Sequence, residues 1–169
     1  MIRPVLTYGA PELRTRSVTV TCFDEELKDL SQDMLETMYA ASGVGLAAPQ
    51  IGVSSRLIVI DPFSGEKKGH QFVFVNPVIS EKKGSEKNEE GCLSIPGFTA
   101  AVKRPTCVQV AGQDLEGNPQ KLEAEGLLAR IFCHEIDHLD GVLYIDLISA
   151  VKKDFILKKI RKLVRAGEW

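Results

Sequence analysis

Apolar residues recur at helical spacing in three stretches of the chain, and the first stretch runs from about Asp24 to Ser42. Its apolar stripe consists of Leu27, Leu30, Met34, Met38 and Ala41. Asp24 suits the N-cap position, because its short side chain can accept a backbone N–H, and Gly43 suits the C-terminal end. The pattern predicts an N-terminal amphipathic helix with one face on the core.

The second stretch, from about Glu125 to Asp140, is apolar on two faces and stops at Gly141. At roughly 100° per residue, one face carries Leu127, Ile131, His134 and His138, and another carries Leu128, Phe132, Ile136 and Leu139. A helix with two apolar faces is expected to be buried in the middle of the protein.

A third helix is expected after Ser149, which is a second candidate N-cap. Its lysines and arginines are expected to face solvent. The residues expected to face inward are Val151, Phe155, Ile156, Ile160, Leu163 and Val164.

Strand signals lie between the first two helices. Leu57–Ile60 and Phe72–Val75 are short, β-branched or aromatic, and bounded by turn residues. Weaker signals occur at Pro77–Ser80, Thr106–Ala111 and Gln120–Ala124, with a turn at Asp114–Asn118 and an exposed polar loop at Glu81–Glu89. The elements predict an α+β fold, in which antiparallel strands pack around a buried central helix, with further helices near both ends.

Length and composition fit one domain over residues 1–169. The chain has 169 residues, 44% hydrophobic and 26% charged, which suffices for a self-supporting core. No apolar run reaches the roughly 18 residues of a membrane span, and the N-terminus lacks the apolar stretch of a secretory signal. We therefore expect a cytoplasmic protein without membrane contact, in which the four scattered cysteines are free thiols.

The charge is unevenly distributed, although the net charge is only −2. Residues 150–169 hold seven of the 21 basic and two of the 23 acidic residues, so this basic C-terminal helix carries +5 (7 − 2) and residues 1–149 carry −7 (14 − 21). The helix is either an ordinary solvated face or a docking surface for an anionic partner. Sequence-specific nucleic-acid binding is not expected.

The strongest chemical signal is His134-Glu135-Ile136-Asp137-His138. Two histidines four residues apart on a helix project side by side, so both imidazoles can reach one metal ion. Glu135 is close enough to contact another ligand of that metal. The alternative, two core histidines and a surface glutamate, is disfavoured because such groups are costly to bury unpaired in a nearly all-apolar helix.

A catalytic metal site usually has three protein ligands and a water, so a third ligand is needed. His70 lies in a polar segment and Cys133 points away from its neighbouring histidine, which makes both poor candidates. Cys92 lies between glycine and strand-forming residues and could face inward. Composition alone favours an inert, packed Cys92.

Three segments together resemble the peptide deformylase family. They are Gly43-Val44-Gly45-Leu46-Ala47-Ala48-Pro49-Gln50, Glu90-Gly91-Cys92-Leu93-Ser94, and His134-Glu135-Ile136-Asp137-His138. They occur in the family's order, and the similarity extends through Arg104-Pro105 and Glu125-Gly126-Leu127-Leu128. One difference lies at the pocket rim, where Thr99 stands in place of the arginine of some bacterial members.

The resemblance implies hydrolysis of the formyl group of N-formyl-methionyl peptides, with release of formate. Cys92, His134 and His138 would bind one divalent metal ion, Glu135 would be the general base and then the acid, and Gln50 and the Leu93 N–H would face the formyl oxygen. The substrate-binding residues would be Val44, Gly45 and Gly91 along the peptide backbone, with Leu127 and Ile131 around the methionine side chain.

The resemblance also implies a cofactor and partners. Iron(II) is the expected metal in the cell, with zinc, nickel or cobalt as chemically competent substitutes. The basic helix is expected to contact the ribosome, and the protein is expected to be a monomer. Glu90 and Asp137 are the nearest acidic residues to the ligands, and at least one of them is expected to hydrogen-bond a ligand imidazole or brace its loop.

Two other functions share part of this pattern. A metallopeptidase of the HExxH type would use Glu135 and both histidines, but a cysteine third ligand and the Gln50 segment disfavour it. A non-catalytic metal-binding protein would need a fourth protein ligand to close the site, and no clear one exists in the sequence.

Overall fold

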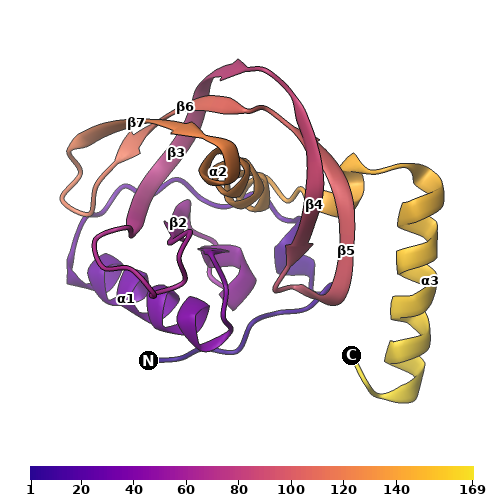
Figure 1. Ribbon diagram of the computed structural model, residues 1–169. Helices are drawn as coiled ribbons and strands as arrows, with labels where there is room; N and C mark the ends of the chain where they lie inside the picture. The colour runs from indigo at the N-terminus through magenta and orange to yellow at the C-terminus, as the bar shows by residue number, and fades with distance from the viewer.

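Two antiparallel sheets and three α-helices make up the computed structural model, which describes residues 1–169 (Figure 1). The larger sheet has the order β1-β2-β3-β6-β7, and β4 and β5 form a separate two-stranded sheet. The strands are β1 Gly45–Ala47, β2 Leu57–Ile60, β3 Phe72–Lys83, β4 Glu86–Cys92, β5 Ile95–Arg104, β6 Cys107–Gln113 and β7 Pro119–Glu125. The helices are α1 Glu25–Ala40, α2 Gly126–Leu139 and α3 Ala150–Ala166, with short 3-10 turns η1 Pro11–Arg14, η2 Ala48–Ile51 and η3 Tyr144–Leu147. The expected α+β class is confirmed.

Strand β2 is buried on both faces because a helix covers each side of it. Leu57 and Val59 belong to the core cluster that contains Met34 and Met38 of α1. Ile58 and Ile60 belong to the cluster that contains the inward side chains of α2. A strand covered on both faces needs a continuous apolar run, which explains why Leu57–Ile60 was recognisable from the sequence.

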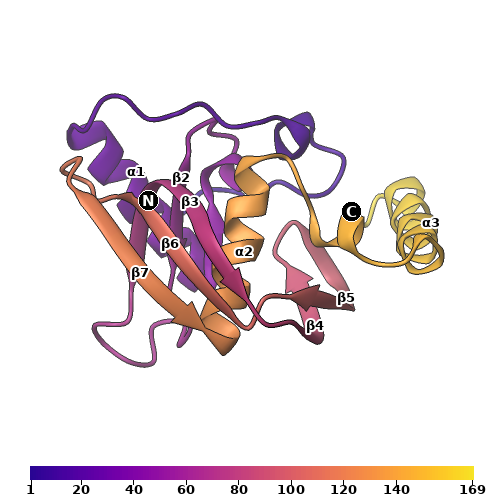
Figure 2. The ribbon, with the colours of Figure 1, turned by 90° about the horizontal axis from the view of Figure 1, so that it is seen from above.

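Helix α2 occupies the centre of the molecule, as its two apolar faces predicted. Figure 2 shows it between the larger sheet and the β4–β5 pair. Phe132 packs edge-on against Phe72 and Phe74 of β3, with ring centroids 5.9 and 5.2 Å away. Its central position lets one helix present side chains to both sheets.

The expected loop at Glu81–Glu89 is wrong. Strand β3 continues to Lys83, the chain turns at Gly84 with a φ of 69°, and β4 begins at Glu86. These residues are exposed, yet their backbone pairs with β6 and β5. Polar side chains hid the strands because an exposed two-stranded ribbon needs no apolar face along most of its length. Strands β1 and β5 were also not predicted.

Helix α3 begins where the sequence indicated, since the Ser149 side chain accepts the Lys152 N–H. The expected inward face is wrong in part. Only Ile156 and Ile160 are buried, whereas Val151, Phe155 and Val164 are 80%, 58% and 56% exposed. Figures 1 and 2 show the reason: α3 projects beside β5 and touches the rest of the molecule along one side only. None of the helices combines the length and apolar composition that a membrane crossing requires.

Asp146 joins three parts of the chain near α3. Its carboxylate accepts hydrogen bonds from Arg14 of η1 at 3.1 Å, Lys153 of α3 at 2.8 Å and the Leu143 N–H at 2.9 Å. Burial raises the pKa of this carboxyl group, but the three hydrogen bonds outweigh burial and lower the pKa to about 2.

We expect Asp146→Asn to reduce the free energy of unfolding by about 1–2 kcal/mol at pH 7. Because the folded-state pKa is depressed, this contribution is present above the unfolded-state pKa near 4 and is lost as the pH falls towards 2. Urea unfolding at pH 7 and pH 3 measures it. The difference between variant and parent should shrink at pH 3, and an equal difference at both pH values would contradict the ionic origin.

Candidate metal centre

Helix α2 brings His134 and His138 to one point. The residues lie one helical turn apart, and their Nε2 atoms are 3.2 Å from each other. Both side chains are buried. Burial lowers the pKa of His138, which favours the neutral imidazole that metal binding requires.

Cys92 completes a group of three donor atoms from the end of β4. Its Sγ lies 3.3 Å from the Nε2 of His138, and the three donor atoms all lie within 4.8 Å of one another. A tetrahedral cation with bonds of about 2.0–2.1 Å to nitrogen and about 2.3 Å to sulfur sets its donors about 3.4–3.6 Å apart. The donor set therefore fits one cation. Cys133, expected to pack, is in the core cluster around α2.

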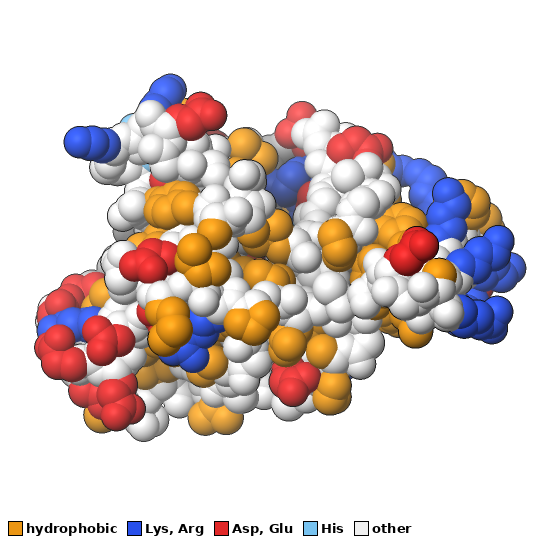
Figure 3. Space-filling view, turned by 90° about the horizontal axis from the view of Figure 1, so that it is seen from below, with side chains coloured by type: hydrophobic (Ala, Val, Ile, Leu, Met, Phe, Trp, Pro, Cys, Tyr) orange, Lys and Arg blue, Asp and Glu red, His pale blue; other side chains and the backbone are white.

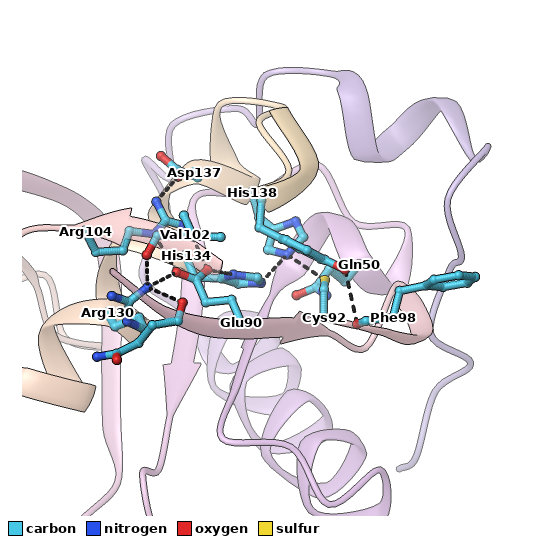
Figure 4. Close-up of polar contacts among 12 residues, drawn as sticks. Gln50, Glu90, Cys92, Phe98, Val102, Arg104, Arg130, His134, Asp137 and His138 are labelled. Atoms are coloured by element: carbon cyan, nitrogen blue, oxygen red, sulfur yellow. Dashed lines mark hydrogen bonds and ion pairs between the residues drawn. The ribbon is translucent and has the colours of Figure 1, made fainter. Parts of the chain in front are cut away.

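Glu90 holds the far side of the His134 ring. Its Oε1 lies 2.9 Å from His134 Nδ1, so this nitrogen carries the proton and Nε2 is free to bind a cation. Arg104 donates to both oxygens of Glu90, at 2.8 and 2.9 Å, and Arg130 donates to Oε2 at 2.7 Å (Figure 4). Although burial opposes ionisation, the hydrogen bonds with Arg104 and His134 lower the pKa of Glu90 to about 2. The contact expected between an acidic residue and one of the two imidazoles is present.

Two further residues belong to this network. The Asp137 Oδ2 accepts a hydrogen bond from Arg104 Nη1 at 2.6 Å. Arg130 was overlooked, although it is buried, donates to the carbonyls of Val102 and Glu86, and ties α2 to the β4–β5 pair. A charged residue within the apolar helix was the available signal.

The amide nitrogen of Gln50 points towards the Cys92 sulfur, beside the two histidines. The Ala47 N–H donates to Gln50 Oε1 at 2.9 Å, which fixes which end of the amide is oxygen. Gln50 Nε2 then lies 3.6 Å from Cys92 Sγ and donates to Ser94 Oγ at 3.1 Å. Turn η2 therefore presents a side-chain donor beside the three atoms that could hold a metal ion. Ser94 is a second residue that the sequence reasoning missed.

Glu135 lies directly against the backbone of Gly45. A Cβ atom at Gly45 would stand 2.4 Å from Glu135 Oε1 and 2.8 Å from Cδ, which is too close for any real contact. Glu135 is buried and its Oε2 has no hydrogen-bond partner in the protein. Burial, with a smaller contribution from Glu90, raises the pKa of this carboxyl group to about 7. The arrangement leaves one carboxylate oxygen available to another molecule.

We expect Gly45→Ala to lower kcat by roughly 10- to 100-fold, because the methyl group must displace Glu135 from its position. Steady-state kinetics with a formylated dipeptide, the substrate that the sequence resemblance implies, measures the loss. Metal content should stay at the parent level, since no donor atom moves. In the double variant with Glu135→Gln the two losses should not add, and full additivity would show that Gly45 acts elsewhere.

A cavity of about 520 Å³ opens beside the three donors. It lies between the β1 region, the β4–β5 pair and α2. The expected site residues that line it are Val44, Gly45, Gln50, Gly91, Cys92, Leu93, Leu127, Ile131, His134 and Glu135. His138 is the only expected site residue outside this lining. Phe98, Thr99 and Arg130 also line the cavity, and of these only Thr99 had been singled out.

Comparison with known proteins identifies the relatives of this chain. The polypeptide deformylase family model matches residues 2–154. A peptide deformylase from Acidobacterium capsulatum is 50% identical over 169 residues, covering 100% of this chain and 99% of the relative. A peptide deformylase from Rhizobium meliloti is 46% identical, covering 97% of this chain and 95% of the relative.

Solved structures agree with the sequence matches. The peptide deformylase from Legionella pneumophila superposes with a TM-score of 0.91 at 45% identity, covering 99% of this chain and 98% of that one. The enzyme from Synechococcus elongatus, solved in complex with actinonin, gives 0.89 at 42% identity and covers 93% and 86%. Family model, relatives and structures all span nearly the whole chain, and the chain therefore belongs to the polypeptide deformylase family.

Proposed function

We propose that this chain is a metal-dependent hydrolase that removes the formyl group from N-formyl-methionyl polypeptides. One observation carries the proposal: three soft or borderline donors, a buried carboxylate and an oriented amide converge at one end of a substrate-sized cavity. Three protein donors leave a fourth position for substrate or water, as catalytic rather than structural sites do. We therefore disfavour a purely structural metal.

Cys92, His134 and His138 would hold the cation, which supplies the Lewis acidity that makes water nucleophilic near neutral pH and polarises a carbonyl. Glu135 takes a proton from the attacking water and later returns it to the leaving amine. The water oxygen bonds to the formyl carbon, the C–N bond breaks, and the products are formate and a free α-amine.

Gln50 and Leu93 would stabilise the negative charge on the formyl oxygen. The Nε2 of Gln50 is already held towards the centre by the bonds of its amide to Ala47 and Ser94. The Leu93 N–H belongs to the turn that follows Cys92. Donors fixed before the reaction need no reorganisation as charge develops, which is why they lower the barrier.

The peptide would bind as an added strand between the two sheets. Strand β1 is an edge of the larger sheet and β4 pairs only with β5, so both offer unpaired backbone groups beside the cavity. Val44 and Gly45 lie on one side, and Gly91 lies on the other. Ile131 is buried, and Leu127, one turn earlier on the same face of α2, is largely exposed, which suits a pocket for a methionine side chain that opens to solvent.

Formate release from formyl-Met-Ala, compared with cleavage of an internal peptide bond, tests the reaction. We expect formate alone. Cleavage of the internal bond would instead support an HExxH metallopeptidase. Actinonin, present in the Synechococcus elongatus structure, is expected to compete with the formylated peptide for the same cavity.

We propose iron(II) as the metal in the cell, with zinc, nickel or cobalt as substitutes. A thiolate ligand favours these softer cations over magnesium or calcium. Because an iron–thiolate centre can be oxidised at sulfur, anaerobically purified iron enzyme should lose most of its activity within hours in air. Metal analysis and activity are measured on the same sample, and constant activity of verified iron enzyme in air would contradict the assignment.

We also propose that the chain acts in the cytoplasm as a single catalytic domain and a monomer, with α3 contacting the ribosome. The basic side chains of α3 gather at one edge of the molecule (Figure 3). They are Lys152, Lys153, Lys158, Lys159, Arg161, Lys162 and Arg165. Reversing the charge of the exposed lysines should abolish salt-sensitive co-sedimentation with ribosomes and leave formate release unchanged; binding that is undiminished and independent of salt refutes electrostatic docking.

A further inference from the structure

Trp169 returns from the end of α3 to contact Tyr8 and Phe98, of which Phe98 lines the cavity. Helix α3 ends at Ala166, and the C-cap residue Gly167, with a φ of 71°, reverses the chain direction. Trp169 Nε1 then donates to the Tyr8 carbonyl at 2.8 Å, and its ring lies 6.2 Å from the ring of Phe98. Trp169 and Phe98 pack against the same apolar cluster, which contains Ile156 and Ile160 of α3.

Both contacts of Trp169 lead to the turn that follows Cys92. The Tyr8 N–H donates to the Ser94 carbonyl at 2.8 Å, and the Ser94 hydroxyl accepts the Gln50 amide at 3.1 Å. Phe98 follows the turn on its other side, where its carbonyl accepts the Tyr144 hydroxyl at 3.1 Å. In Figure 4 the Phe98 ring points away from the two histidines. Trp169, which packs near that ring, is not among the residues that line the cavity.

No residue between Ile160 and Trp169 belongs to the apolar cluster or packs against it. Of residues 161–169, only Leu163 and Trp169 are even half-buried, and Trp169 alone packs against the cluster. Trp169 therefore attaches the C-terminal end of α3 to the rest of the molecule. It contacts Tyr8, which bonds to Ser94 of the Leu93–Ser94 turn, and Phe98, which follows that turn.

We propose that Trp169 is a positioning residue, which holds the turn carrying Cys92, the Leu93 N–H and Ser94 in place from outside the site. The inference rests on the proposed deformylase reaction. It does not place Trp169 in contact with substrate. Because Leu93 and Gln50 act on charge that develops during the reaction, loosening the turn should lower kcat while KM changes little.

The test compares Trp169→Ala and Trp169→Phe with Val164→Ala, an exposed change on the same helix. All are loaded with cobalt(II), whose absorption bands respond to the geometry of the Cys92 and histidine donors. We expect Trp169→Ala to lower kcat about 5- to 20-fold with KM within about 2-fold, and to shift the cobalt bands. Trp169→Phe keeps ring packing and loses only the hydrogen bond, so its loss should be smaller. Val164→Ala should match the parent.

Trp169 is the only tryptophan of the chain, so its fluorescence reports its own environment. The parent should emit at shorter wavelength than free tryptophan, and Phe98→Ala should shift the emission towards that of free tryptophan. Parental kcat and cobalt bands in Trp169→Ala would overturn the proposal, as would a loss of activity that disappears when kcat is normalised to the folded fraction of the protein. If Trp169→Ala does not fold, Trp169→Phe decides on the same two readouts. An inactive parent would overturn the deformylase function instead.

Discussion

Glu135→Gln is expected to fold, retain the metal and lower kcat by about 10³-fold, within the range for loss of a general base. The carboxylate is buried against Gly45, and its Oε2 has no partner in the protein. Glutamine preserves the shape of the side chain and its contacts but cannot accept the proton of the attacking water. The cation-binding atoms belong to other residues, so metal content is the internal control.

Formate release by the purified variant, normalised to bound metal, measures this loss. Glu116→Gln, an exposed change in the β6–β7 turn, is the matched control and should keep parental activity. Turnover within about 5-fold of the parent in metal-loaded Glu135→Gln would exclude Glu135 as the base. If Glu135→Gln and the parent turn over equally fast, hydrolysis would depend on the three residues proposed to bind the metal and not on Glu135.

The part of the site that lies on α2 could be predicted because its signals are local. His134 and His138 are one turn apart whatever the rest of the chain does, and their Nε2 atoms do meet at 3.2 Å. The apolar residues around them on the same helix, such as Ile131, Phe132 and Leu139, also required a buried helix. Strand β2 was predictable for a similar reason, since helices on both faces demand an unbroken apolar run.

Cys92 could not be assigned from its own neighbourhood. A cysteine beside glycine and leucine has the same local pattern in a packed core and in a metal site. Only the pairing of β4 with β5 and the packing of that pair on α2 bring its sulfur to 3.3 Å from His138. The resemblance to a known family supplied that long-range information before the structure did.

The sequence predictions failed for elements that are exposed or covered on one side only, because the apolar pattern of such elements does not report which residues are buried. The polar residues of β4 conceal a strand, and the apolar residues on the outer side of α3 imitate a buried face. Arg130 is the clearest case: its position in an apolar helix makes sense only because Glu90, from a distant strand, accepts its hydrogen bond. Pairing across the chain decides these features, and local propensity does not.

Glu90→Ala is expected to combine a large loss of stability with weaker metal binding. Glu90 accepts hydrogen bonds from Arg104, Arg130 and the His134 Nδ1, and the side chains of Glu90, Arg104 and Arg130 are 5%, 5% and 8% exposed. Its removal leaves buried positive charge without its partner, which typically costs about 3–5 kcal/mol. Loss of the group that orients a metal-binding imidazole typically weakens metal affinity about 10- to 100-fold.

Urea unfolding of metal-loaded protein measures the first effect, and competition with a chelator measures the second. Glu86→Ala is the matched control on the same strand, because only the backbone carbonyl of Glu86 contacts Arg130. Glu90→Gln separates the two effects: its amide can still accept from one arginine but carries no charge, so it should fall between the parent and alanine in both measurements. If Glu90→Ala unfolds within about 1 kcal/mol of the parent and binds metal equally well, the two arginines find other partners and the carboxylate does not orient His134.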